Sequence, residues 1–184
     1  ALERSEPARA AIGRTLPDVH IGAGLDDLPS VGEVVVIGNE VLDNMPTALA
    51  RRTERGWEEM VVAFASGGLT LESGGARADV AAWCDAAFGD PEPGAVVAAQ
   101  LAMTDWLASL LGRFEAVHAC LIDYAAPSDE LATRPAGSVV RAFRRHRATD
   151  MVIDDPGATD LTVEVNIDAV AQAASRLGYE VTVG

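Results

Sequence analysis

The run Val34-Val35-Val36-Ile37 constrains the fold more than any other segment of the chain. Consecutive β-branched residues favour a strand, and a strand without alternating polar positions is typical of a parallel sheet that is buried on both faces. We therefore expect a central strand over residues 32–38, and the similar run at residues 116–123 predicts a second one.

Segments with helical spacing alternate with these strands. Ser5 suits an N-cap, Pro7 suits a first turn, and Gly178 suits the position after a last helix. We expect helices over residues 5–15, 79–87, 97–114 and 167–177, and short strands over residues 19–22 and 179–184. The alternation predicts an α/β fold with a mostly parallel sheet and helices on both faces, whose ligands bind at the carboxyl ends of the strands.

Two stretches have a different pattern. In residues 51–72 polar and apolar positions alternate, with a turn at Arg55-Gly56. Residues 133–167 have the same alternation, with a turn at residues 155–157. Both patterns predict antiparallel strands. We expect one domain over residues 1–184, with β-rich insertions near 50–75 and 133–166. Because the chain opens without methionine and closes on a strand-like pattern, we interpret it as a fragment.

The composition argues against several classes of protein. There are 28 acidic residues against 14 basic ones, all of them arginine, and the net charge is −14. A nucleic-acid-binding protein needs clustered cations, so we expect no nucleic-acid partner, whereas a cationic ligand suits the charge. The apolar runs are too short for a membrane helix, and the sequence shows no signal-peptide pattern. We expect a cytoplasmic protein in which Cys84 and Cys120 are buried free thiols.

Acidic residues follow the first predicted strands, the earliest of which we expect to end at Leu2-Glu3. Glu3 has the position of an acid that accepts both ribose hydroxyls of a nucleotide, with a solvated surface glutamate as the alternative. Asp26 or Asp27 could accept an adenine amino group, or could cap a turn.

The segment after the central strand points most clearly to function. Asn39, Glu40 and Asp43 follow the strand directly, where burial of a carboxylate is costly unless it is paired or binds something. If a helix begins there, Glu40 and Asp43 lie on one face of it. The alternative is that both residues cap that helix. We favour a functional role.

Charged residues also follow the second buried strand. Asp123 and Tyr124 close it, and residues 141–147 hold four arginines and His146. These cations could hold an acidic substrate group or pair with the strand-end carboxylates, or form a solvated strand face. We count His146 among the candidate catalytic residues. No nucleophile, metal or phosphate-loop motif occurs, so we expect no metal, and we expect the glycine-rich nucleotide loop upstream of Ala1.

The segment GNEVLDNMP at residues 38–46, followed by RTERGWEEMVV at residues 52–62, resembles the MidA-like family of methyltransferases. The likeness continues, in the family's order, at residues 121–124, 137–146 and 156–162. The resemblance implies a Rossmann-like fold and S-adenosylmethionine as cofactor. It also implies methyl transfer to a protein side chain, which is arginine in the family's mitochondrial branch. A small-molecule acceptor and a homodimer are left open.

The same resemblance implies roles for the strand-end residues. Glu3 would hold the cofactor ribose and Asp26 or Asp27 the adenine, while Asn39, Glu40 and Asp43 would line the methyl-transfer pocket. Carboxylates complement the cationic sulfonium, and a pair of them could grip an incoming guanidinium and accept its proton.

The chain departs from the family at three positions. Ala125 replaces a glycine, and Glu164 and Asn166 stand where the family has a histidine and an acid. These departures motivate an alternative, a catalytically lapsed relative that serves as an assembly or interaction factor. A further alternative is a dinucleotide-dependent oxidoreductase, which would carry Gly-x-Gly-x-x-Gly upstream. We expect the fragment by itself to be inactive.

Overall fold

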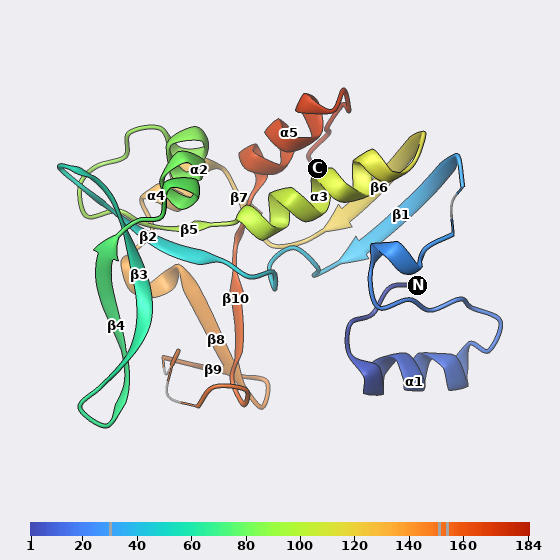
Figure 1. Ribbon diagram of the computed structural model, residues 1–184, viewed down its shortest axis with the longest axis horizontal. Helices are drawn as coiled ribbons and strands as arrows, with labels where there is room; N and C mark the ends of the chain where they lie inside the picture. The colour runs from blue at the N-terminus through green and yellow to red at the C-terminus, as the bar shows by residue number, and fades with distance from the viewer. Residues whose placement is uncertain (30, 151, 154) are drawn as a thin grey trace.

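The computed structural model describes residues 1–184 except residues 30, 151 and 154 (Figure 1). Its helices are α1 (Glu6–Thr15), α2 (Ala78–Phe88), α3 (Leu101–Arg113), α4 (Ser128–Ala132) and α5 (Ile167–Arg176), with the 3-10 helices η1 (Leu25–Asp27) and η2 (Ala136–Ser138). Its strands are β1 (Glu33–Asn39), β2 (Ala48–Thr53), β3 (Gly56–Ala65), β4 (Gly68–Gly75), β5 (Val96–Ala99), β6 (Ala116–Ile122), β7 (Ala125–Ala126), β8 (Val140–Arg144), β9 (Arg147–Thr149), β10 (Asp160–Val163) and β11 (Val165–Asn166).

Parallel pairing joins the strands that carry the candidate site. β1 pairs with β6 in parallel, with Asn39 opposite Ile122 at the carboxyl end, and β7 pairs with β11 in parallel. The short strand expected at residues 19–22 is reduced to one parallel bridge between Gly22 and Leu2. Along the chain, helices separate many of the strands, and the strands form both parallel pairs and antiparallel sheets. This confirms the predicted α/β class.

Antiparallel strands occupy both predicted insertions. One sheet has the order β4-β3-β2-β5 and another the order β10-β8-β9. One boundary was predicted wrongly, because the stretch expected to be helical from residue 97 begins with β5. All four residues of β5 are buried, and they pair with β2 before α3 begins at Leu101. Val96 and Val97 are β-branched and lie buried beside β2, and such a position favours a strand. Here the pairing with β2 outweighs the helical spacing of the residues that follow.

Only one face of the β1–β6 pair is covered by described residues. Val117 of β6 belongs to the same core cluster as Leu107 of α3 and Val170 of α5. On the opposite face Val35 and Ile37 are 75% and 76% exposed. The prediction that this run is buried on both faces is therefore wrong for the part of the chain that the structure describes, since no described element packs there.

The two cysteines also differ from each other. Cys84 of α2 is fully buried in a second cluster that includes Ala50, Trp57 and Val97, whereas Cys120 is exposed. Burial raises the pKa of the Cys84 thiol to about 12, with smaller contributions from nearby carboxylates. The expectation of two buried thiols holds for Cys84 and is wrong for Cys120.

The predicted helix ends are confirmed. The side chain of Ser5 accepts a hydrogen bond from the Ala8 N–H and caps α1, and Gly178 follows α5 with a φ of 83°. The strand expected at residues 179–184 does not form, because no described strand lies alongside to pair with it. Tyr179 instead donates its hydroxyl hydrogen bond to the carbonyl of Leu111 in α3, at 3.0 Å. None of the described helices has the length and apolarity needed to cross a bilayer.

Candidate functional site

The carboxyl ends of β1 and β6 meet because the two strands are parallel and in register. The chain leaves β1 at Glu40, whose N–H donates to the carbonyl of Ile122 at 2.8 Å. Glu40 has a φ of 50°, a conformation that is uncommon for a residue other than glycine. Its side chain is exposed. Strained backbone of this kind costs on the order of 1 kcal/mol and persists where the surroundings impose it, often at functional sites.

Asp123 imposes that conformation from the end of β6. Its Oδ2 atom accepts hydrogen bonds from the backbone N–H groups of Val41, Leu42 and Asp43, at 3.1, 2.9 and 3.4 Å. Burial raises the pKa of Asp123 above its ordinary value; the backbone donors oppose this rise, and the nearby Asp43 carboxylate adds to it. Asp123 therefore fixes the turn that follows β1, where no helix begins.

Asp43 joins this turn to β10. It is 5% exposed, and its Oδ2 atom accepts a hydrogen bond from the Thr162 hydroxyl at 2.6 Å, while Asn44 donates to its Oδ1 atom at 2.7 Å. The alternative of a helix cap does not describe Asp43, because its partners are side chains. The sequence did not single out Thr162, which is a buried strand residue without a local motif.

Arg141 brings one cation of the arginine-rich segment to the same place. It lies opposite Thr162 in the β8–β10 pair, and its guanidinium carbon lies 5.3 Å from the centroid of the Tyr124 ring. The Nε atom of Arg141 is buried and has no hydrogen-bond partner among the described residues. The strand end thus combines carboxylates, a phenol and a guanidinium.

His146 lies elsewhere. Arg145 and His146, with φ values of 51° and 62°, form the turn between β8 and β9 and are exposed. The turn begins four residues beyond Arg141, roughly 13 Å along a strand. Figure 1 shows β8 and β9 running away from the end of β1. The structure does not bring His146 to the strand end.

The acids near the beginning of the chain lie beside the Leu2–Gly22 bridge. Glu3 accepts a hydrogen bond from the Ser5 N–H at 2.6 Å. Asp27 accepts from two backbone N–H groups of its own loop, at 2.7 and 3.2 Å, and these donors lower its pKa. Asp26 is exposed, 3.5 Å from Arg113. No hydrogen bond or salt bridge among the described residues joins these acids to the end of β1.

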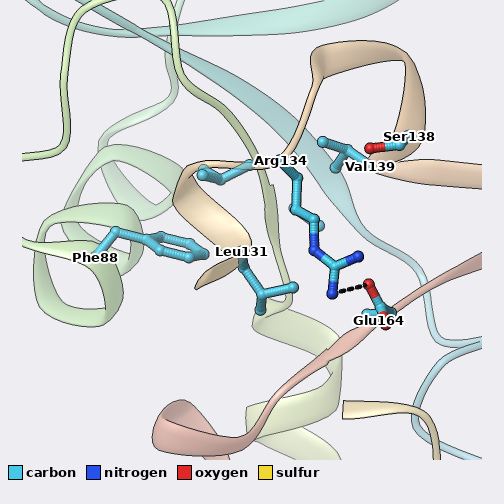
Figure 2. Close-up of a pocket in the computed structure, with 8 residues that line it drawn as sticks. Phe88, Leu131, Arg134, Ser138, Val139 and Glu164 are labelled. Atoms are coloured by element: carbon cyan, nitrogen blue, oxygen red, sulfur yellow. Dashed lines mark ion pairs between the residues drawn. The ribbon is translucent and has the colours of Figure 1, made fainter. Parts of the chain in front are cut away.

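Structural partners account for the two departures near the end of the chain. Glu164 forms an ion pair with Arg134 at 3.0 Å, which Figure 2 shows in a small pocket. Asn166 is fully buried and caps α5 by accepting from the Ala169 N–H, while its own N–H donates to Gln100. Asn166 thereby fixes the start of α5, and Glu164 ties the link between β10 and β11 to the segment after α4. No group of three or more metal-ligating side chains that could hold a metal ion occurs in the described part of the chain.

Comparison with known proteins identifies the family. The profile of a family described as "Putative S-adenosyl-L-methionine-dependent methyltransferase" matches residues 2–183. A crystal structure from Burkholderia thailandensis, bound to S-adenosyl-homocysteine, is 30% identical with a TM-score of 0.75. A native crystal structure of an uncharacterized protein from the same organism has the same identity and TM-score. The matches cover 96% of this chain but 47% and 49% of those chains, so this chain spans about half their length.

The same comparisons decide the cofactor. S-adenosylmethionine is the methyl donor of the matching family, and S-adenosyl-homocysteine is what remains of that donor after methyl transfer. The predicted cofactor is confirmed, and the family match favours a methyltransferase over the oxidoreductase alternative. None of the curated proteins matches this chain. The chain belongs to this family of S-adenosylmethionine-dependent methyltransferases.

Proposed function

We propose that this chain supplies the acceptor side of a methyltransferase that acts on a protein side chain, with arginine as the acceptor class. The observation that carries the proposal is Glu40, an exposed carboxylate that stands at the end of β1 in a strained conformation. Half-buried Asp123 and buried Asp43 support that conformation from behind. A carboxylate held in this way can bind a guanidinium through charge-assisted hydrogen bonds and accept its proton.

The contacts suggest separate roles for the candidate residues. Asn39 and Glu40, both exposed, would meet the cofactor and the acceptor. Asp43 would act as a positioning residue, since both of its carboxylate oxygens already accept hydrogen bonds. His146 would touch the acceptor protein from the exposed β8–β9 turn.

The residues that would bind the cofactor are proposed from the hydrogen-bond donors that S-adenosylmethionine carries, its ribose hydroxyls and its adenine amino group. Glu3 would accept the ribose hydroxyls and Asp26 the adenine amino group, while Asp27 would hold the loop between them. Acceptor-only carboxylates fit both donor groups. The glycine-rich loop would belong to the part of such proteins that this chain does not span, which is about half of the length of the solved structures. We also propose a cytoplasmic location.

The test is made on a protein that contains residues 1–184. Binding of S-adenosylmethionine is measured by calorimetry, and methyl transfer is measured with labelled cofactor and an arginine-containing peptide. We expect Glu40→Gln to lower the transfer rate more than about tenfold without changing the melting temperature, because one charge-assisted contact is lost. Glu54→Gln, at an exposed turn, is the matched control.

The outcomes separate the proposal from its rivals. A folded protein that binds no cofactor would defeat the enzyme proposal. Cofactor binding without transfer to any peptide would favour the lapsed relative. Full activity in the Glu40→Gln variant would remove Glu40 from the site and leave the family assignment intact.

A further inference from the structure

A groove outside the strand-end site lies between three helices. Residues of α2, α3 and α5 enclose about 280 Å³. In Figure 1 α2 and α5 lie on the same side of the molecule, close to the beginning of α3. Five of the twelve lining residues are alanine, three on α2 and two on α5, which lets another backbone approach both walls closely. The volume is slightly below that of pockets that enclose a whole small ligand, so it fits one or two inserted side chains.

The charged residues of the groove favour a positively charged occupant. Asp105 is exposed, and its carboxylate has no hydrogen bond or salt bridge among the described residues. The Asp79 carboxylate accepts a hydrogen bond from the Val80 N–H at 2.9 Å and forms a long salt bridge to Arg77 at 3.8 Å, and the side chain is 57% exposed. The one cation of the lining, Arg176, is held by Gln172 at 2.9 Å. In a chain with a net charge of −14, these aspartates complement a basic segment and repel an acidic one.

Trp83 adds an aromatic surface to the same lining. Its indole N–H donates to the Thr104 hydroxyl at 3.3 Å, and its ring packs against Phe88 with an edge-to-face geometry. These two contacts fix the ring in one orientation. A guanidinium or ammonium group near a tryptophan ring gains a cation–π attraction in addition to its attraction to carboxylates.

We propose that this groove docks a basic, arginine-containing segment of the protein that is methylated. The proposal rests on the proposed function, and it places recognition of the acceptor at a surface separate from the end of β1. One or two cationic side chains of the segment would enter between Asp79 and Asp105, over Trp83. The acceptor would thereby be selected by its charge before its methylated side chain reaches Glu40.

The test uses a defined peptide, acetyl-Ala-Arg-Ala-Arg-Ala-amide, titrated into the protein without cofactor. The readout is the indole N–H signal of Trp83 in a proton–nitrogen NMR spectrum, assigned with Trp83→Phe. We expect a saturable shift, and we expect the double variant Asp79→Asn/Asp105→Asn to bind about three- to tenfold more weakly, the range for two exposed charge contacts. The double variant Asp18→Asn/Glu180→Gln, which removes the same charge at exposed positions elsewhere, should bind like the parent.

A peptide with citrulline in place of arginine keeps the shape and removes the charge. We expect it to bind at least threefold more weakly than the arginine peptide. Equal binding of the two peptides, equal binding by the Asp79→Asn/Asp105→Asn variant, or shifts that miss Trp83 would each overturn the proposal. Because these measurements need neither cofactor nor turnover, a failure here is distinguishable from a failure of the methyltransferase assay.

Discussion

The hydrogen bond between Thr162 and Asp43 should be the most costly single contact to remove at the strand end. Thr162→Val keeps the β-branched shape and the pairing of β10 with β8, but it removes the hydroxyl that lies 2.6 Å from the Asp43 carboxylate. Thr162 is 9% exposed and Asp43 is 5% exposed, so water cannot readily replace the lost donor.

The magnitude follows from the charge and the burial. A hydrogen bond to a charged group contributes about 1.5–3 kcal/mol, and loss of its donor leaves a buried acceptor without that partner. The added methyl group returns less than about 0.8 kcal/mol of hydrophobic stabilisation. We therefore expect Thr162→Val to lower the free energy of unfolding by about 2 kcal/mol. For a domain of this size this lowers the melting temperature by roughly 4–8 °C.

The assay is urea unfolding followed by tryptophan fluorescence, with the parent, Thr162→Val and Thr162→Ser measured side by side. Thr162→Ser keeps the hydroxyl and should lose about 1 kcal/mol or less, the value of the missing methyl group. Thr133→Val removes an exposed hydroxyl, bonded to the Glu130 carbonyl, and should change stability by less than about 0.5 kcal/mol. If Thr162→Val unfolds within about 0.5 kcal/mol of the parent, the reasoning about the buried Asp43 contact is refuted.

Three further measurements test other parts of the structure. In native protein containing residues 1–184 alone, N-ethylmaleimide should modify the exposed Cys120 and leave Cys84 unmodified, since burial raises the pKa of Cys84 to about 12; mass spectrometry of the digested protein would show the reverse if the burial is wrong. Glu40→Gly should raise the free energy of unfolding by about 0.5–1 kcal/mol by relieving a φ of 50°, while lowering methyl transfer; a destabilised variant would mean that the backbone is not strained. The pKa of Asp27 is lowered in the folded protein, so Asp27 contributes its full stabilisation at pH values above its ordinary pKa of 3.8. This contribution is lost as the pH falls through the lower pKa of the folded state, so Asp27→Asn should make the free energy of unfolding less dependent on pH at the acid end.

Local patterns along the chain determined most of the secondary structure. Ser5 and Gly178 marked helix ends because capping depends on neighbouring residues alone. The apolar runs marked β1 and β6 because an unbroken run of branched residues suits an extended backbone. The rule that ligands bind where parallel strands end also points to Asn39, Glu40 and Asp43, because it depends only on the order of the elements along the chain.

Only the tertiary structure decided what these residues touch. Asp43 meets Thr162 across 119 positions of the chain, and Asp123 meets the turn after β1 across more than 80. No local periodicity encodes such pairs, because they arise when separate segments pack together. The same holds for the strand β5, the face of β1 that no described element covers and the distant place of His146, since burial and pairing depend on which neighbours a segment finds once the chain has folded.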